Sequence, residues 1–383
     1  MSAKIAVIGA GVFGAWTSHQ LQQLGHRVTL IDAFGPAHSR SSSGGESRLI
    51  RAAYGRDSIY TRMARDSLPE WKALSDSAGL PIFVRCGILF FFASAEVYAA
   101  ETMEAHRELG LSTQALARAE MTQRFPVIDF DGITLGLYEP DFGALMARRA
   151  VQILVDRFVR AGGTYVTGKA EAPRFPAAKV EQIELSSGVA IDADYFIYAL
   201  GPWLPKVFPD VIGPRIRVTR QEVFYFAGPA GDSRFFPEKL PGWVDFNEGD
   251  MFYGFPDLEG RGVKFAYDVH GPEVDPDIQS REPTRAAFEQ VVSYRDRRFP
   301  SLKGAPLIGA EVCQYENSST GDLLIDFHPA FENVLLVGGG SGHGFKHGPA
   351  VGRYAAARLF ESVDPEPRFS LASKSEVHQR EVH

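Results

Sequence analysis

Short apolar runs and one helical stretch dominate the start of the chain. An apolar run over Lys4–Ile8 ends in a cluster of glycines. Apolar residues then recur at helical spacing over residues 15–24, and a second apolar run covers Arg27–Asp32. A strand, a helix and a strand in this order predict a βαβ unit. Such a unit needs a parallel sheet that is covered on both faces.

The rest of the chain shows two kinds of pattern. Buried strands and amphipathic helices, as in a parallel sheet with helices around it, recur in the middle and at the end of the chain. Aromatic, strand-like runs of the kind found in antiparallel sheets lie between them. The first kind comprises helices at 58–74, 145–161 and 350–360 with strands at Thr164–Thr167, 193–200 and 334–337, and the second comprises strands at 83–92, Ile216–Phe226, 251–255 and Val263–Tyr267 with helices at 95–109 and 281–299.

This distribution predicts two intertwined domains of an α/β (α+β) protein. We expect a doubly wound, Rossmann-like nucleotide-binding domain, capped by a mainly antiparallel sheet that holds the substrate. We expect residues 366–383 to form a flexible, polar tail. The nucleotide domain is assigned residues 1–78, 145–210 and 318–365, and the substrate domain residues 79–144 and 211–317.

The first glycine cluster is a dinucleotide-binding fingerprint in its expected context. Gly9-Ala10-Gly11-Val12-Phe13-Gly14 follows a strand and opens a helix, and Asp32 ends the next strand. Gly9 permits the tight turn, Gly11 lets a pyrophosphate approach the backbone, and Gly14 lets helix and strand pack closely. The helix N-terminus attracts phosphate. We expect Asp32 to accept hydrogen bonds from the adenosine ribose.

A second glycine-rich turn near the end of the chain favours FAD over NAD. The strand at 334–337 leads into Gly338-Gly339-Gly340-Ser341-Gly342-His343-Gly344 and then into a helix. Two such turns, far apart in sequence, suit a cofactor that is held at both ends. The backbone N–H groups of the second turn can stabilise negative charge on the N1–C2=O side of a reduced flavin.

Composition and charge narrow the class of protein. Of the 383 residues, 45% are hydrophobic and the net charge is −7, so the chain can bury large cores and carries no basic stripe for nucleic acid. No apolar run is long enough for a membrane span, and nothing suggests a signal peptide or a metal site. The two cysteines, Cys86 and Cys313, cannot build a disulfide framework and suit a cytoplasmic protein.

From about residue 4 to residue 360 the chain resembles the amine-oxidising FAD family that includes D-amino acid oxidase. It is most similar to the branch of monomeric sarcosine oxidase and N-methyltryptophan oxidase, whose members are monomers. The segments that carry the resemblance, in family order, are Ile31-Asp32-Ala33-Phe34, Ser47-Arg48-Leu49-Ile50-Arg51, Tyr253-Gly254-Phe255-Pro256, Val263-Lys264-Phe265, Val312-Cys313-Gln314-Tyr315 and Ser341-Gly342-His343-Gly344-Phe345-Lys346.

The resemblance implies a set of cofactor contacts. Cys313 stands where this branch attaches the flavin covalently through its 8α-methyl carbon. Without the resemblance, Cys313 would be read as a small buried apolar residue, as we read Cys86. The expected cofactor-binding residues are Gly9, Gly11, Val12, Phe13, Gly14, Asp32, Ala33, Ser42, Arg48, Cys313, Gly340, Gly342, His343, Gly344 and Lys346.

The resemblance also implies catalytic and substrate-binding roles. Lys264 is expected to activate oxygen, since a fixed cation lowers the barrier to forming superoxide. Arg51 and Lys346 are expected to hold a substrate carboxylate, and Arg48 to face the flavin. Tyr253 and Tyr315 match tyrosines of the pocket wall. Without the resemblance, the arginines could equally well form surface ion pairs. Lys264 could equally well lie at the edge of a sheet, and the two tyrosines could belong to the hydrophobic core.

One position departs from the pattern of the sarcosine oxidases. Asp268 stands where those enzymes have an active-site histidine, and His270 lies two residues further on. Relatives that act on cyclic imino acids carry an acidic residue in this region. We therefore expect a substrate other than sarcosine itself, in a pocket whose shape depends on Trp243, Asp245, Phe246 and Asp268.

The resemblance implies oxidation of the C–N bond of a small secondary amino acid, N-methyl or cyclic. A hydride goes from the carbon next to nitrogen to flavin N5, the imine product hydrolyses, and O2 is reduced to hydrogen peroxide. Three alternatives stay open: an oxidase of pipecolate-type cyclic or glycated (fructosyl) amino acids, an FAD dehydrogenase of the same fold, and a non-catalytic FAD-binding or redox-sensing module.

Overall fold

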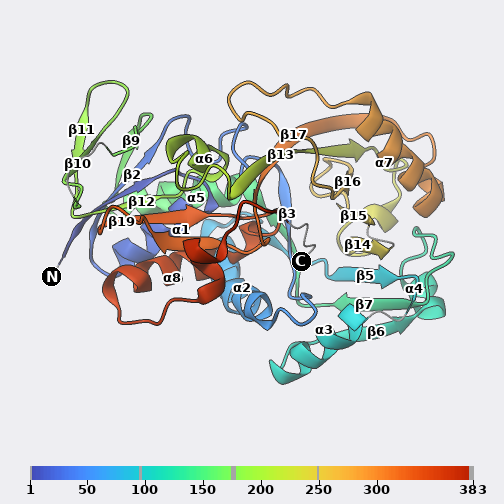
Figure 1. Cartoon of the computed structure of the whole chain (residues 1–383). Helices are drawn as coiled ribbons and strands as arrows, with labels where there is room; N and C mark the ends of the chain where they lie inside the picture. The colour runs from blue at the N-terminus through green and yellow to red at the C-terminus, as the bar shows by residue number, and fades with distance from the viewer. Residues whose placement is uncertain (1, 95–96, 174–177, 248–249, 379–383) are drawn as a thin grey trace.

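Two large sheets lie side by side in the computed structural model, which describes residues 2–94, 97–173, 178–247 and 250–378. In Figure 1 the six-stranded sheet occupies the left half and the eight-stranded sheet the right half. The chain crosses between them several times, because segments far apart in sequence contribute to each sheet. The α/β (α+β) fold predicted above is confirmed.

The six-stranded sheet contains the predicted βαβ unit. Its order is β18-β19-β12-β1-β2-β9, and β1 pairs in parallel with both β2 and β12. Only the pair of β18 and β19 is antiparallel. The strands are β1 (Lys4–Ile8), β2 (Arg27–Asp32), β9 (Thr164–Thr167), β12 (Tyr195–Tyr198), β18 (Leu324–Phe327) and β19 (Val334–Gly338).

Both faces of this sheet are buried, as its continuous apolar strands require. Alternate residues of β1 face opposite ways, so that Ile5 and Val7 enter one apolar core while Ala6 and Ile8 enter another. The first core lies against four helices. They are α1 (Val12–Gln23), α2 (Ser58–Ala78), α5 (Ala147–Arg160) and α8 (Gly348–Phe360).

The second core lies beneath α6 (Leu204–Val207) and the two-stranded sheet of β10 (Gln182–Glu184) and β11 (Ala190–Asp192). Within the described residues, no helix combines the length and the apolar content that a membrane span needs.

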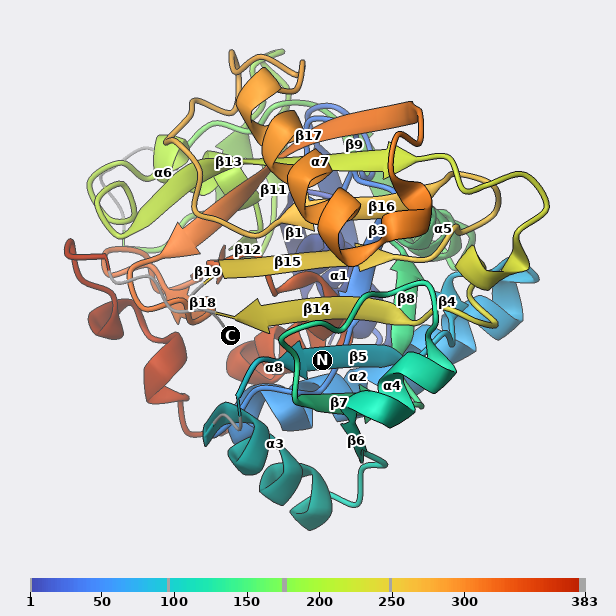
Figure 2. The same ribbon diagram turned by 90° about the vertical axis from the view of Figure 1, so that its right-hand side faces the viewer.

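The eight-stranded sheet has the order β17-β13-β16-β15-β14-β5-β7-β6 and is antiparallel except where β14 pairs with β5. Figure 2 shows these strands one above another, with α7 (Arg285–Arg298) in front of the sheet. The strands are β5 (Ile88–Phe92), β6 (Gln114–Ala117), β7 (Leu135–Glu139), β13 (Ile216–Phe226), β14 (Gly242–Asn247), β15 (Asp250–Phe255), β16 (Val263–Tyr267) and β17 (Leu307–Ser318).

A small sheet of β3 (Ser47–Ile50), β8 (Gly143–Met146) and β4 (Phe83–Val84) joins the two halves. The helices α3 (Val97–Glu108) and α4 (Arg118–Arg124) flank β6 and β7 (Figure 2). Apart from Ser318 at the end of β17, the strands of each large sheet fall inside the segments assigned to its domain, while the domain boundaries themselves stay a prediction.

The long apolar run at 83–92 is not one strand, as its pattern suggested, but two. Gly87 between β4 and β5 has φ +75°, where a side chain would also collide with the Tyr138 ring. Cys86 lies in a small apolar cluster, as expected, and burial raises the pKa of its thiol to about 11. The strands β14 and β17 were not predicted, because polar residues interrupt their apolar pattern.

The polar segment after residue 365 is packed against the protein over its described part, in contrast to the predicted flexible tail. Phe369 is buried, and the Arg368 guanidinium pairs with Asp322 at 2.6 Å and with Asp57 at 2.9 Å. Two short 3-10 helices, Pro367–Phe369 and Leu371–Ser373, form this segment. Phe369 and Arg368 are two isolated contact residues in a polar segment, so they produce no periodic hydrophobic pattern. The packing of this segment could therefore not be predicted from the sequence.

Glycines at four-residue spacing let α8 lie directly against α1. A Cβ at Gly348 would stand 2.5 Å from the Trp16 ring, and one at Gly352 would stand 2.8 Å from the Trp16 backbone carbonyl. A Cβ at Gly344, just before α8, would stand 2.8 Å from the Phe13 ring. α1 begins within the first glycine turn, and one 3-10 turn (Phe345–His347) leads from the second glycine turn into α8, so this contact brings the two turns together.

The α1–α8 contact should not tolerate a methyl group. Gly352→Ala must push α8 away from the Trp16 backbone, and overpacking of this kind costs about 1–3 kcal/mol. The higher helix propensity of alanine, about 1 kcal/mol, offsets only part of this. We expect a lower urea midpoint and a lower FAD content than in the parent protein. The matched control is Gly228→Ala, whose new Cβ would meet nothing closer than 3.7 Å. Equal midpoints for the two variants would contradict this reading of the contact.

Candidate functional site

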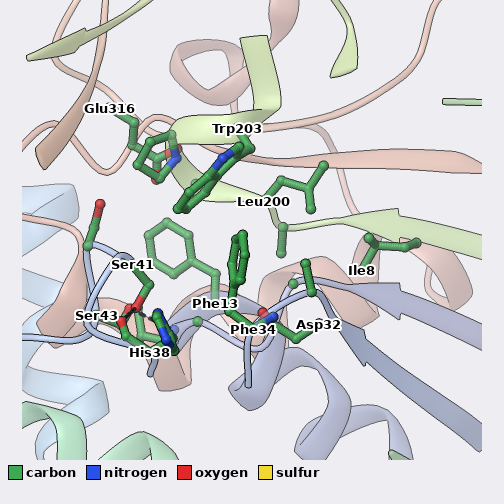
Figure 3. Close-up of a pocket in the computed structure, with 18 of the residues that line it drawn as sticks. Ile8, Phe13, Asp32, Phe34, His38, Ser41, Ser43, Leu200, Trp203 and Glu316 are labelled. Carbon is green, nitrogen blue, oxygen red and sulfur yellow. Dashed lines mark hydrogen bonds between the residues drawn. The ribbon is translucent and has the colours of Figure 1, made fainter. Parts of the chain in front are cut away.

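A cavity of about 370 Å³ lies between the two glycine turns. Figure 3 shows Phe13, Phe34 and Trp203 around it, with Asp32 on one side and Glu316 on another. It opens at the carboxyl ends of β1, β2 and β12, where open parallel sheets bind their ligands. Of the predicted cofactor-binding residues, those that line it are Gly9, Gly11, Val12, Phe13, Asp32, Ala33, Ser42, Arg48, Gly340, Gly342 and Gly344.

The three fingerprint glycines meet different neighbours. Gly9 has φ +107°, and a Cβ there would collide with the Ala199 carbonyl. A Cβ on Gly14 would collide with the Gly9 carbonyl, so this glycine serves the packing of helix on strand. Gly11 is different, because a Cβ there would come no closer than 3.4 Å to the protein, at Ser43 Oγ. The open space beside Gly11 is therefore left for a ligand.

Asp32 braces the first glycine turn. Its Oδ1 accepts hydrogen bonds from the backbone N–H groups of Phe34 and Gly35 at 2.8 and 2.9 Å, and its Oδ2 accepts one from Ala10 at 2.7 Å. The carboxylate thus ties the end of β2 to the loop that lines the cavity. The expected contact with a ribose stays a prediction.

Glu316 is a feature of the cavity that sequence reasoning missed. Its Oε1 accepts a hydrogen bond from Gly340 N at 3.3 Å, while its buried Oε2 has no partner among the described residues. Burial raises the pKa of this carboxyl to about 7. A polar atom of this kind in the lining suits a ligand with polar groups of its own. Together with the open space at Gly11 and a first turn of α1 that holds no acidic residue, this fits a dinucleotide such as FAD.

A second cavity, of about 70 Å³, adjoins the first and shares Arg48, Tyr315, Ser341, Gly342 and Phe345 with it. It brings together side chains from β3, β15, the end of β16 and the second glycine turn. Its remaining lining includes the predicted residues Arg51, Tyr253, Asp268, His343 and Lys346, together with Leu49, Val244, Met251 and His270.

Two cations line this small cavity and are almost completely buried. Arg51 is 5% exposed and Lys346 is 3% exposed. Both lie against Tyr54: the guanidinium carbon is 4.2 Å from the centre of its ring, and Lys346 Nζ donates to its hydroxyl at 2.8 Å. Tyr54 was not predicted, although its place three residues after Arg51 could have suggested it. Buried cations of this kind are costly unless an anion joins them.

A buried acid fixes the backbone next to Arg51. Glu139 on β7 is fully buried, and its Oε1 accepts a hydrogen bond from Ala52 N at 2.8 Å. His106 Nε2 lies 3.8 Å from the same oxygen. Burial raises the pKa of Glu139, and His106 and the hydrogen bond from Ala52 lower it in part. Sequence reasoning missed both residues, because each lies in a segment whose pattern indicated only core.

Asp268 acts electrostatically on the wall of the small cavity. Burial, and then Asp268, raise the pKa of Tyr253 to about 12 and the pKa of Tyr315 well above its ordinary value. Both phenols are therefore uncharged hydrogen-bonding groups at neutral pH. The backbone N–H of Asp268 donates to the Met251 carbonyl at 2.7 Å, which fixes the chain at the end of β16.

Lys264 and Cys313 line neither cavity, and both lie near Arg48. Lys264 is 1% exposed, and its Nζ donates to the Ser47 carbonyl at 3.0 Å. Burial, and then the Arg48 guanidinium, lower the pKa of Lys264 to about 7. Arg48 Nη2 donates to Cys313 Sγ at 3.3 Å.

Three residues expected to shape the substrate pocket are not among those that line the small cavity. Trp243 and Asp245 point to the other face of β14, where Trp243 is in the core and Asp245 pairs with Arg298 at 3.0 Å. Val244 between them lines the cavity instead, opposite Tyr253 in the register of β14 and β15. Phe246 stacks on Tyr98 at 4.9 Å. The strand's alternation explains the correction, since β14 itself was not predicted.

Comparison with known proteins agrees with this geometry. Residues 4–358 match the DAO family, described as FAD dependent oxidoreductase. The chain belongs to this family. It is 30% identical to monomeric sarcosine oxidase of Bacillus sp. (strain B-0618), covering 91% of this chain and 90% of that one. It is 29% identical to N-methyl-L-tryptophan oxidase of Salmonella arizonae, covering 97% of each.

Solved structures show the same fold. The crystal structure of L-proline dehydrogenase from P. horikoshii has a TM-score of 0.84 and 19% sequence identity, covering 97% of each chain. The fold described above is therefore the one that its structural neighbours share.

The pKa of Lys264 leads to a pH-dependent prediction. The protonated lysine is the form that stabilises superoxide, and it predominates below this pKa of about 7. The reaction of the reduced enzyme with oxygen should therefore slow as pH rises through and above this pKa. Lys264→Met should be slow at every pH, by about a hundred- to thousandfold, because it removes a positioned charge. Stopped-flow mixing of reduced enzyme with oxygen measures both effects, and a variant with the rate and pH profile of the parent would exclude the role.

Proposed function

We infer that this protein is an FAD-dependent oxidase of a small secondary amino acid, either N-methyl or cyclic. One observation carries the proposal: two buried basic side chains, Arg51 and Lys346, and an acid, Asp268, line the same small cavity, which adjoins the proposed flavin site. An amino acid presents a carboxylate and a protonated nitrogen, which complement this arrangement of charges.

The residues of the chain bind, orient and shield the substrate. The Arg51 guanidinium can bind a carboxylate through two hydrogen bonds, and Lys346 adds a point charge. Tyr253 and Tyr315 hold the substrate from the side, which places its carbon next to nitrogen towards the shared wall at Arg48. FAD, when bound in the large cavity, supplies the chemistry of removing a hydride from that carbon.

The size of the small cavity favours a small substrate. Its volume of about 70 Å³ leaves room for an amino acid with a short or cyclic side chain, while an indole or a sugar would need the lining to move. Relatives are named for sarcosine and for N-methyltryptophan, so the side chain is where this family varies. We therefore place this protein with the oxidases of small substrates.

A cyclic amino acid is the second candidate for the substrate. Asp268 favours it, because a carboxylate near the nitrogen stabilises a cyclic ammonium or iminium. The FAD dehydrogenase alternative is disfavoured by Lys264, a buried cation close to Arg48 that suits a reaction with oxygen. The non-catalytic FAD-binding module is also disfavoured. Binding FAD alone would not require four buried or half-buried basic side chains, which here are Arg48, Arg51, Lys264 and Lys346.

Oxygen consumption tests the proposal directly. The purified holoenzyme is offered N-methyl, cyclic and glycated amino acids, each beside the same amine without its carboxylate. We expect the highest kcat/KM for a small N-methyl or cyclic amino acid and almost no turnover of the amines. Turnover of an amine as fast as its acid analogue would overturn the carboxylate-binding role of Arg51 and Lys346.

The proposal includes a covalent bond between FAD and Cys313. Cys313 Sγ lies beside Arg48 and Ser42, both of which line the flavin cavity. FAD should remain with the protein after acid precipitation of the parent, and Cys313→Ala should release it. Cys86→Ala is the matched control, since Cys86 lies in an apolar cluster and its loss should leave the flavin attached. An unmodified Cys313 peptide in the mass spectrum of the yellow parent protein would contradict the bond.

The role of Asp268 has a specific test. Asp268→Asn keeps the shape of the side chain and removes its charge. We expect it to weaken binding of a secondary amino acid by about tenfold, the loss of one charge-assisted contact. Binding of a thioether carboxylate, which has sulfur in place of nitrogen, should change much less. Titrations followed by flavin absorbance measure both affinities, and equal weakening would show that Asp268 does not recognise the nitrogen.

A further inference from the structure

Lys346 has only uncharged hydrogen-bond partners. Its Nζ donates to the Tyr54 hydroxyl at 2.8 Å and to the His343 carbonyl at 2.7 Å, and it makes no ion pair with the described residues. A neutral amine has two N–H groups and one lone pair. The two acceptors use both N–H groups, so the remaining tetrahedral position of Nζ is left for a proton.

The surroundings of Lys346 disfavour a permanent charge there. Burial, and then the nearby Arg51, lower the pKa of Lys346 well below its ordinary value, while Glu139 and Asp268 raise it in part. The other titratable groups around it are Tyr54, His343 and His347: the Tyr54 hydroxyl lies 2.8 Å from His347 Nε2 and 3.3 Å from His343 Nδ1. A substrate carboxylate between Arg51 and Lys346 adds the negative charge that a protonated Lys346 needs.

An amino acid in water carries a proton on its nitrogen that it must lose before oxidation. A C=N bond forms with the nitrogen lone pair, and an ammonium has none to offer. When a zwitterion binds in this cavity, Lys346 must gain a proton to form an ion pair with the carboxylate. At the same time, the substrate nitrogen must lose its extra proton before oxidation.

We propose that Lys346 takes the ammonium proton of the bound amino acid, so that one proton transfer makes both the charged carboxylate partner and the neutral amine. An N–H bond of the substrate breaks, an N–H bond forms on Nζ, and the total charge of the occupied cavity does not change. This role rests on the proposed function, in which Arg51 and Lys346 bind the carboxylate. Tyr54 is a positioning residue, because its hydroxyl fixes Nζ.

The proposal predicts how protons move when different ligands bind. A thioether carboxylate has no proton to give, so Lys346 must take one from solvent when this ligand binds. Calorimetric titration of the oxidised holoenzyme in two buffers of different ionisation enthalpy measures that uptake. Near pH 8 we expect about one proton per ligand bound, and an affinity that falls about tenfold per pH unit above the pKa of Lys346.

Three variants separate this role from others. In Lys346→Arg the cation is permanent, so the ligand should still bind but with no proton uptake and little dependence on pH. Lys346→Met should bind it more weakly, also without uptake. The exposed Lys303→Arg is the matched control and should behave as the parent. Flavin absorbance and the unfolding temperature confirm that each variant holds FAD and is folded.

The possible failures are distinguishable. Binding without proton uptake in the parent overturns the proton-accepting role while the carboxylate-binding role stands. Uptake that persists in Lys346→Arg also overturns it and assigns the proton to another group, such as His343 or His347. Failure of the parent to bind the thioether carboxylate at all overturns the proposed function and this role together.

Discussion

The close contact of α1 with α8 is the constraint on which the rest of the site depends. α1 begins within one glycine turn and α8 a single 3-10 turn after the other, and Gly348 and Gly352 of α8 lie against Trp16 of α1. Helices normally pack 8–10 Å apart, depending on the side chains between them, and glycines give the closest approach. The two turns therefore face one cavity, although more than three hundred residues of sequence separate them. A larger residue at the contact would widen the gap between the two halves of the flavin site.

The substrate site follows from this arrangement, because the same segments continue from one cavity into the other. The second turn lines the flavin cavity at Gly340 and runs on to Lys346 in the small cavity. β3 does the same from the opposite side, with Arg48 at both cavities and Arg51 at the small one. β17 places Tyr315 on the common wall. A substrate in the small cavity is thereby next to the flavin cavity without a separate binding domain having to close over it.

The sequence predicted the nucleotide-binding half better than the half that holds the substrate. The strand, the glycine turn and the helix at Lys4–Gly14 are continuous in sequence, so spacing alone indicates their contacts. Arg51, Lys346 and Asp268 could be predicted together only through the resemblance to a family, since no periodicity relates them. Glu139, Tyr54 and Glu316 were missed because a buried polar residue within an apolar segment looks like an interruption of the pattern. β14 was missed in the same way, which placed Trp243 and Asp245 at the pocket instead of Val244.

The pKa values of the two buried lysines are lowered for the same physical reason, although the proposed roles of the lysines differ. Each lies beside an arginine, Lys264 beside Arg48 and Lys346 beside Arg51, and in each case burial and that arginine lower the pKa of the lysine. An arginine keeps its charge under all these conditions, so it is the lysine that responds to what occupies the cavity. An anion at either place favours the protonated lysine, and its departure favours the neutral one. A permanently charged arginine beside a lysine of lowered pKa lets each pair stabilise a nearby anion without holding two uncompensated charges when no anion is close.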